Sequence, residues 1–255
     1  MASQVIRGRI ALGALFIAIA FVIIGFLQAD REMTRAEHDR ATVTVSETAT
    51  LVEVFLLREL VQLRSLERLV AGHMLDGSKF DDSLLTATSE SSSQAVPFDG
   101  VWIVDAGGQL RTIPFRNHEI ASLDTNDLAE LTRRRSRPTP FVRVRGGNRH
   151  RTLMFVEPME TPIRQTLVAV VAADSLAVML ERQQRRKPVR VVVTASTDTV
   201  TQLGVLSPND KSRMLRQSVG TPLANDWAVA IAYIPSGRGA RIALWVVGLG
   251  AIVGL

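Results

Sequence analysis

The pattern of apolar and polar residues divides the chain into two uncharged blocks and a long mixed region between them. Residues 10–27 (IALGALFIAIAFVIIGFL) carry no charge over eighteen positions. As a helix this block is about 27 Å long, against a bilayer hydrocarbon core of roughly 30 Å. It exceeds the apolar stretch of about 7–15 residues in a cleaved signal peptide. The block therefore predicts an uncleaved membrane anchor.

The second block, residues 242–255, is uncharged over fourteen residues and runs into the last residue of the sequence. At about 21 Å of helix it is too short to span a bilayer. We therefore expect the sequence to be the N-terminal portion of a longer protein, with this block beginning a second span. A buried C-terminal core helix is the alternative. Arg7 and Arg9 precede the first block, so the positive-inside rule places the N-terminus in the cytoplasm and the region between the blocks outside.

A long helix is predicted after the first block, because residues 26–71 contain neither Gly nor Pro. An apolar stripe at helical spacing runs along its last part. The stripe consists of Leu56, Leu60, Leu63, Leu66 and Val70. The β-branched segment ATVTVSETAT in the middle is less favourable for a helix, and a strand there is the alternative.

The pattern then changes to short apolar runs separated by turn residues. Residues 101–114 and 141–159 predict two hairpins, with Gly107–Gly108 and Gly146–Gly147 at the turns. Asp124 is a good cap for a short helix between them. A buried strand (TLVAVVAAD) and a helix (SLAVMLERQQRR) follow the second hairpin. This order predicts an α+β fold with a mostly antiparallel five-stranded sheet, because hairpins exclude the crossovers that a parallel sheet needs.

Residues 189–235 predict a reduced second α+β module. The segments VRVVVTAS and VTQLGV predict two strands, and DWAVAIAYIP predicts a final strand that leads to the second apolar block. The segment PNDKSRMLRQ predicts a helix that opens at Pro208.

Composition and motifs exclude several classes of function. The chain has no cysteine, so disulfides, thiolate metal sites and cysteine nucleophiles are excluded. Phosphate-loop, zincin, serine-hydrolase and dinucleotide signatures are absent, and the four histidines lack ligand spacing. We therefore expect no catalytic residues, no metal and no cofactor in this portion. An enzymatic output domain beyond residue 255 would be compatible with that expectation.

The net charge of +5 is concentrated in arginine clusters. Eight arginines occur between Arg133 and Arg151 with no acidic residue among them. A second cluster comprises Arg182, Arg185, Arg186, Lys187 and Arg190. Arg143 and Arg145 are two apart in a predicted strand and share one face, where they would bind an anion such as a dicarboxylate. The alternative is that these arginines keep an exposed edge strand soluble or face anionic lipid headgroups. The predicted membrane segments make nucleic acid an unsuitable partner for the arginine clusters.

The segments FDGVWIVDAGGQL and FVEPMETPIRQTLVAVVAADSLAVML resemble the extracytoplasmic PAS-like or Cache sensor domains of bacterial receptors. The resemblance rests on Asp105, Gly107, Gly108 and the strand-end Asp174. It implies a stalk helix from the first span, a central antiparallel sheet that holds a small ligand, and a second module returning to the membrane. It also implies that the carboxylate of Asp174 binds a ligand amine, whereas a helix cap is the alternative. The Tyr, Arg and Trp signature of amino-acid-binding members is not recognisable.

The candidate ligand-binding residues are therefore Trp102, Arg143, Arg145 and Asp174, with Trp102 either lining a pocket or filling the core. The predicted parts are a cytoplasmic N-terminus (1–9), a transmembrane helix (10–27), a stalk helix (28–75), a membrane-distal PAS-like domain (76–187), a membrane-proximal PAS-like module (188–236) and an incomplete second transmembrane helix (240–255).

We expect the signal-input portion of a bacterial inner-membrane receptor, homodimeric, with its central region periplasmic. The missing output would be a histidine kinase, a cyclic-di-GMP enzyme or a chemotaxis module. The alternative is a membrane-anchored envelope protein that binds a protein or polyanion through its basic surface.

Overall fold

A computed structural model describes most of the chain. The described residues are 2–75, 98–105, 107–113, 123–134, 139–146, 151–159, 165–184, 190–204 and 212–234. They divide into two compact units, one made of Val45–Leu206 and Arg216–Ile231, the other of Met1–Thr44, Ser207–Leu215 and Ala232–Leu255. Among the described residues, no helix has a stretch long and apolar enough to cross a membrane. The second predicted membrane segment lies outside the described residues, and both segments stay predictions.

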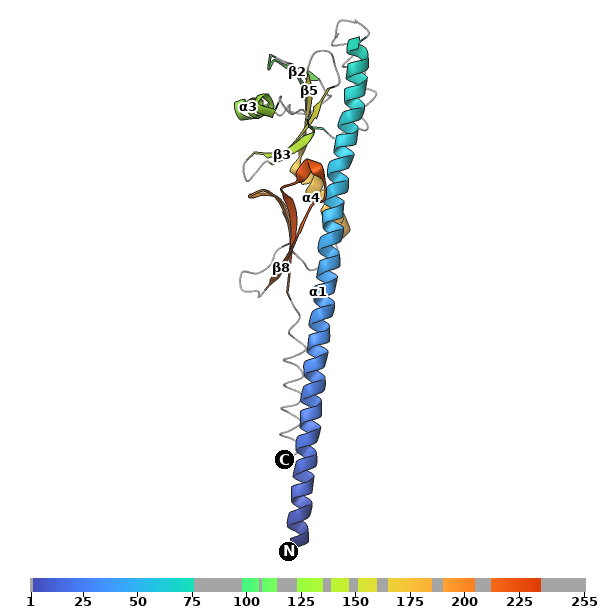
Figure 1. Ribbon diagram of the computed structural model, residues 1–255, viewed down its shortest axis with the longest axis vertical. Coiled ribbons are helices and arrows are strands. Elements are labelled where there is room, and N and C mark those ends of the chain that lie inside the picture. Colours follow the sequence, from blue (N-terminus) through green and yellow to red (C-terminus); the bar gives the residue numbers. More distant parts are fainter. Residues whose placement is uncertain are drawn as a thin grey trace. The chain divides into compact units, whose positions relative to one another are not determined.

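Helix α1 is one continuous element from Ala2 to Leu75 (Figure 1). The predicted apolar stripe is buried throughout, with Leu56 and Leu63 at 0% exposure. The β-branched middle segment is helical rather than a strand. Threonine hydroxyls of this segment donate to carbonyls one turn earlier in the helix, as Thr44 Oγ1 does to the carbonyl of Arg40 at 2.8 Å. Burial of Val45 and Val52 in the same face offsets the lower helix propensity of β-branched residues.

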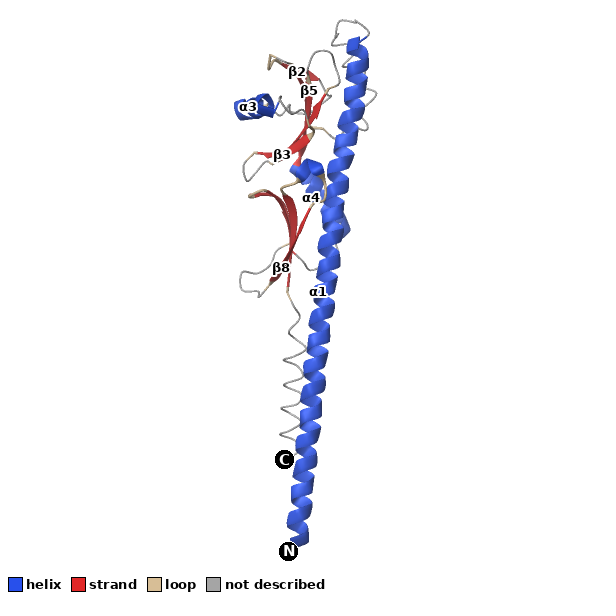
Figure 2. Ribbon diagram, in the orientation of Figure 1, coloured by secondary structure: helices blue, strands red, loops and turns tan. Residues whose placement is uncertain are grey.

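The first sheet has five antiparallel strands, as the sequence predicts (Figure 2). Its strands are β1 (Gly100–Val104), β2 (Leu110–Ile113), β3 (Phe141–Arg145), β4 (Thr152–Pro158) and β5 (Thr166–Ala172). The spatial order is β2-β1-β5-β4-β3, so β5 is central and β2 and β3 are the edge strands. Helices α3 (Thr125–Arg134) and α4 (Ala173–Gln184) complete the predicted element order.

The two faces of this sheet are covered by different helices. On one face, Trp102 and Met154 pack with Leu131 of α3. Residues alternate between faces along a strand, so Glu157 belongs to the opposite face. There its carboxylate accepts a hydrogen bond from Arg64 Nε of α1 at 2.8 Å. The sheet is therefore enclosed between α3 and the C-terminal part of α1.

Both predicted hairpin turns use glycine in the left-handed region, where a side chain would be strained. Gly108 has a φ of 84° in the β1–β2 turn, and Gly146 has a φ of 88° directly after β3. Asp105 stabilises the first turn, because its Oδ1 accepts the N–H groups of Gly107 and Gln109, both at 2.8 Å.

The second sheet has four strands, in the order β7-β6-β9-β8. They are β6 (Arg190–Ala195), β7 (Asp198–Leu203), β8 (Arg213–Ser218) and β9 (Trp227–Tyr233), with the short 3₁₀ helix η1 (Pro222–Ala224) before β9. The prediction of a helix through residues 208–217 is wrong for its described part, which forms β8. Alternating exposure along β8 and its pairing beside the fully buried β9 override the helix propensity of this polar segment.

Candidate functional site

The structure places the four predicted ligand-binding residues in different environments. Trp102 is 3% exposed and belongs to the core between the first sheet and α3. A Cβ added at Gly100 would lie 2.5 Å from the Trp102 ring, so the glycine makes room for it. Asp174 is exposed in the first turn of α4. The helix begins at Ala173, so Asp174 lies inside the first turn and not at the cap position. In the first turn, its negative charge interacts favourably with the helix dipole.

Arg143 and Arg145 do share one face of β3, but they have different surroundings. The Arg145 side chain is 11% exposed, and its Nη2 lies 2.6 Å from Oδ2 of Asp127 on α3. Arg143 is exposed and forms no ion pair with any residue that the structure describes. The two guanidinium groups therefore do not form a joint anion site. Arg145 anchors α3 to the sheet, and Arg143 is left as the available cation.

The start of α3 explains how Asp127 is held. Asp124 caps the helix, as predicted, because its Oδ1 accepts the N–H of Asp127 at 2.7 Å. Oδ2 of Asp127 accepts the N–H of Asp124 in return at 3.1 Å, which makes a reciprocal capping box. The hydrogen bond from the Asp127 backbone, with a smaller effect of the Arg145 charge, lowers the pKa of Asp124 below its ordinary value.

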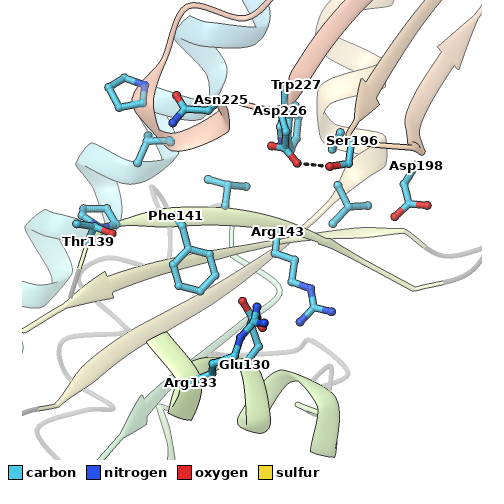
Figure 3. A pocket seen from close by; sticks show the side chains of 16 residues that line it. Glu130, Arg133, Thr139, Phe141, Arg143, Ser196, Asp198, Asn225, Asp226 and Trp227 are labelled. Atoms are coloured by element: carbon cyan, nitrogen blue, oxygen red, sulfur yellow. Dashed lines mark hydrogen bonds and ion pairs between the residues drawn. The ribbon is translucent and has the colours of Figure 1, made fainter. Parts of the chain in front are cut away.

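A cavity of about 580 Å³ lies at the edge strand β3, entirely within the larger unit (Figure 3). Four elements line it: α3, β3, the β6–β7 turn and the segment from η1 to the start of β9. Arg143 is the one predicted site residue among its lining residues. The volume falls within the range of roughly 300–1,000 Å³ that is usual for small-molecule pockets.

The charged groups of the cavity stand on both sides of β3 (Figure 3). Arg143 points to the side of α3, where Arg133 and Glu130 are paired at 2.6 Å. Asp198 and Asp226 lie on the other side of the strand. The cavity thus presents an available guanidinium on one side and carboxylates on the other.

The β6–β7 turn fixes one of these carboxylates. Ser196 is the one described non-glycine residue with a positive φ, at 53°. It follows Ala195 in a two-residue hairpin loop, at a position that favours glycine. Its hydroxyl donates to Oδ2 of Asp226 at 2.7 Å, and its N–H donates to the Asp226 carbonyl at 2.9 Å. A serine in a strained conformation thus holds an aspartate at the cavity, a pairing that the sequence pattern does not indicate.

Neither a metal site nor a ligand site at the second arginine cluster emerges from the described residues. Within the described ranges, no group of three or more His, Asp or Glu side chains could hold a metal ion. Of the second cluster, the structure describes the side chains of Arg182 and Arg190, and Arg190 Nη2 donates to Gln202 Oε1 at 2.7 Å. Lys187 and its two arginine neighbours lie outside the described residues.

Several solved structures that share this fold are ligand-binding or sensory domains of chemoreceptors. No protein-family model matches the chain, and no curated protein matches it in sequence. The ligand-binding domain of the Pseudomonas aeruginosa PAO1 amino acid chemoreceptor PctC, in complex with GABA, superposes with a TM-score of 0.56 at 11% identity, covering 76% of this chain and 98% of that one. The ligand-binding domain of the Pseudomonas fluorescens chemoreceptor CtaA, in complex with L-isoleucine, superposes with a TM-score of 0.56 at 10% identity. The match covers 84% of this chain and 98% of that one.

The extracellular domain of rpHK1S-Z16, a protein named as a histidine kinase, gives a TM-score of 0.51 at 14% identity, covering 83% of this chain and 96% of that one. The TM-scores above 0.5 show a shared fold, and at identities this low the likeness concerns the fold alone. The chain therefore has the fold of the extracytoplasmic ligand-binding domains of chemoreceptors and histidine kinases. The resemblance seen in the sequence is confirmed at that level.

Proposed function

We propose that this chain is the signal-input portion of a two-span bacterial membrane receptor, which binds an extracytoplasmic small molecule and regulates a cytoplasmic output domain. The observation that carries the proposal is the fold, which is that of sensory domains over most of the chain and nearly the whole of each neighbour. The cavity at β3 is of a size suited to a small ligand. The apolar blocks at residues 10–27 and 242–255 support the two membrane spans.

The smaller unit supports a route from the sensor to the membrane. In it, His38 Nδ1 of α1 lies 3.1 Å from the hydroxyl of Tyr233 at the end of β9. The first predicted span precedes His38 in α1, and the second follows Tyr233 along the chain. A ligand transmits a signal if it binds two conformations with different affinity. We propose that a small shift of β9 against α1 at this hydrogen bond distinguishes the two conformations.

An exposed apolar row on α1 supports a homodimer. Val54, Leu57 and Val61 recur at helical spacing and are 53%, 39% and 59% exposed. A second copy of the helix would cover this row. We expect Val61→Glu to lower the dimer fraction measured by light scattering. Val178→Glu is the matched control, because Val178 is an exposed valine of α4 at 47%, and it should leave the dimer fraction unchanged.

The receptor proposal is tested by a thermal-shift screen on the full 255-residue chain. The compounds are amino acids, short peptides, carboxylates, amines and sugars. A ligand at a hundred times its Kd adds about 2.7 kcal/mol of stability. For a protein of this size that raises the Tm by roughly 5–10 °C.

We expect one chemical class to raise the Tm and the others to leave it unchanged. If no compound raises the Tm while anionic vesicles or an envelope protein bind the chain, the receptor proposal is wrong. The envelope interaction protein would then be the better interpretation. The burial of Arg145 in its ion pair already removes one residue from the basic surface which that alternative requires.

A further inference from the structure

The cavity at β3 has three features that bear on the shape and charge of its ligand. Arg143 offers a guanidinium on the α3 side of the strand (Figure 3). Asp198 and Asp226 offer carboxylates on the opposite side. The remaining charged pair, Arg133 and Glu130, is already neutralised within itself. A complementary ligand therefore carries an anionic group at one end and a cationic group at the other.

The edge of β3 separates the two charged groups. β3 pairs with β4 on one side, and the described residues provide no strand on its other side. In an antiparallel edge strand, every second residue directs its N–H and C=O away from the paired neighbour. A ligand that reaches from Arg143 to Asp226 has to cross these backbone groups. Amide groups within the ligand would be able to pair with them.

The two charges of the ligand therefore have to be well separated. In a single α-amino acid, one carbon atom separates the ammonium from the carboxylate, which is too short to reach both sides of a strand. Each further residue in an extended peptide adds about 3.3 Å. Two or three residues supply the length as well as the amide groups, and a molecule of that size fits a cavity of about 580 Å³.

We propose that this cavity binds an elongated zwitterion of the short-peptide type. The ligand carboxylate pairs with Arg143, its ammonium pairs with Asp198 and Asp226, and its amide lies across the edge of β3. The inference rests on the proposed sensory function and names the ligand class of the site. The Ser196 hydroxyl contributes by fixing Asp226 in place before the ligand arrives. Such pre-organisation lowers the ordering cost of binding.

The test is calorimetric titration of the full chain with five probes: alanine, dialanine, trialanine, N-acetyl-dialanine and dialanine amide. We expect dialanine or trialanine to bind. Alanine should bind at least tenfold more weakly. Each blocked peptide should also lose at least tenfold, because each lacks one of the two charges. A tenfold loss corresponds to about 1.4 kcal/mol.

Protein variants assign the two ends of the peptide. Arg143→Gln should weaken dialanine by at least tenfold and leave the affinity for dialanine amide unchanged, because both changes remove the same ion pair. Asp198→Asn should weaken dialanine but leave N-acetyl-dialanine unchanged. Arg111→Gln is the matched control, since Arg111 is an exposed arginine on the other edge strand, β2. It should bind all probes as the unmodified chain does.

Three outcomes overturn this inference. The first is that blocked and free peptides bind equally well. The second is that the losses of affinity from Arg143→Gln and from replacing dialanine by dialanine amide are additive. The third is that no peptide binds. If the thermal-shift screen then yields a non-zwitterionic ligand, the receptor proposal stands and only the ligand class is wrong. Failure of every compound in that screen would instead remove the receptor proposal itself.

Discussion

The ion pair between Arg145 and Asp127 gives the sharpest prediction about stability. Its side chains are 11% and 4% exposed, and the Nη2–Oδ2 distance is 2.6 Å. The same Oδ2 accepts the backbone N–H of Asp124 at 3.1 Å. The substitution Asp127→Asn removes the negative charge while keeping the shape of the side chain. It leaves the guanidinium of Arg145 largely buried beside a neutral group.

Breaking a buried pair by neutralising one partner costs about 3–5 kcal/mol. Proteins have a total stability of roughly 5–15 kcal/mol, so this is a large fraction of the whole. Replacing both partners, as in Asp127→Leu with Arg145→Met, removes both buried charges together. We therefore expect the double variant to be about as stable as the unmodified chain, or more stable. Asp127→Leu alone should be severely destabilising, because it leaves the charge of Arg145 buried without its partner.

The assay is urea denaturation, followed by the fluorescence of the buried tryptophans. With an m-value of about 2 kcal/mol/M, a loss of 3 kcal/mol moves the midpoint by roughly 1.5 M. Arg133→Gln is the control, because its pair with Glu130 is exposed at the arginine and should be worth less than about 1 kcal/mol. A loss below about 1 kcal/mol for Asp127→Asn, or additive effects in the double variant, would refute the reasoning.

Three further predictions concern other parts of the larger unit. Gly100→Ala should destabilise the fold by about 1–3 kcal/mol in urea denaturation, because the new methyl group would lie 2.5 Å from the buried ring of Trp102. Ser196→Ala should cost about 1 kcal/mol through loss of the hydrogen bond to Asp226, whereas Ser196→Gly should be nearly neutral because glycine relieves the strain at a φ of 53°. Since the pKa of Asp124 is lowered in the folded state, its stabilising effect is present above the unfolded-state pKa and is lost as the pH falls through the folded-state pKa. At neutral pH, Asp124→Ala should have a lower free energy of unfolding than the unmodified chain. Denaturation at a series of pH values should show this difference shrinking in that acidic range.

Local patterns predicted those parts of the fold that depend on local interactions. The stripe from Leu56 to Val70 is buried as its spacing indicates. Each hairpin turn has a glycine with a positive φ at a predicted position, Gly108 in the first and Gly146 in the second. Asp124 caps α3 because a cap needs no partner beyond the first turn of its own helix. Each of these signals is contained within a single helix or turn.

The rest depends on partners that are distant in sequence. Nothing near Arg145 in the sequence indicates that Asp127, on another element, neutralises it. The segment of β8 has the polar composition of an exposed helix, and its place beside β9 makes it a strand. Ser196 meets Asp226 only because two turns of the second sheet lie together. Sequence reasoning found one residue of the cavity, Arg143, and could not find the carboxylates opposite it.

The central position of β5 has a consequence for amide hydrogen exchange. This strand is paired with β1 and β4, and its residues from Leu167 to Val171 are all at 0% exposure. Their amide protons should exchange only when the whole sheet opens, at a rate set by the global free energy of unfolding. The outward amides of β3 have no strand beside them among the described residues, so they exchange without opening of the whole sheet. A ligand at that edge would therefore slow exchange in β3 first, and exchange rates in the two strands would separate local protection from global stabilisation in a single experiment.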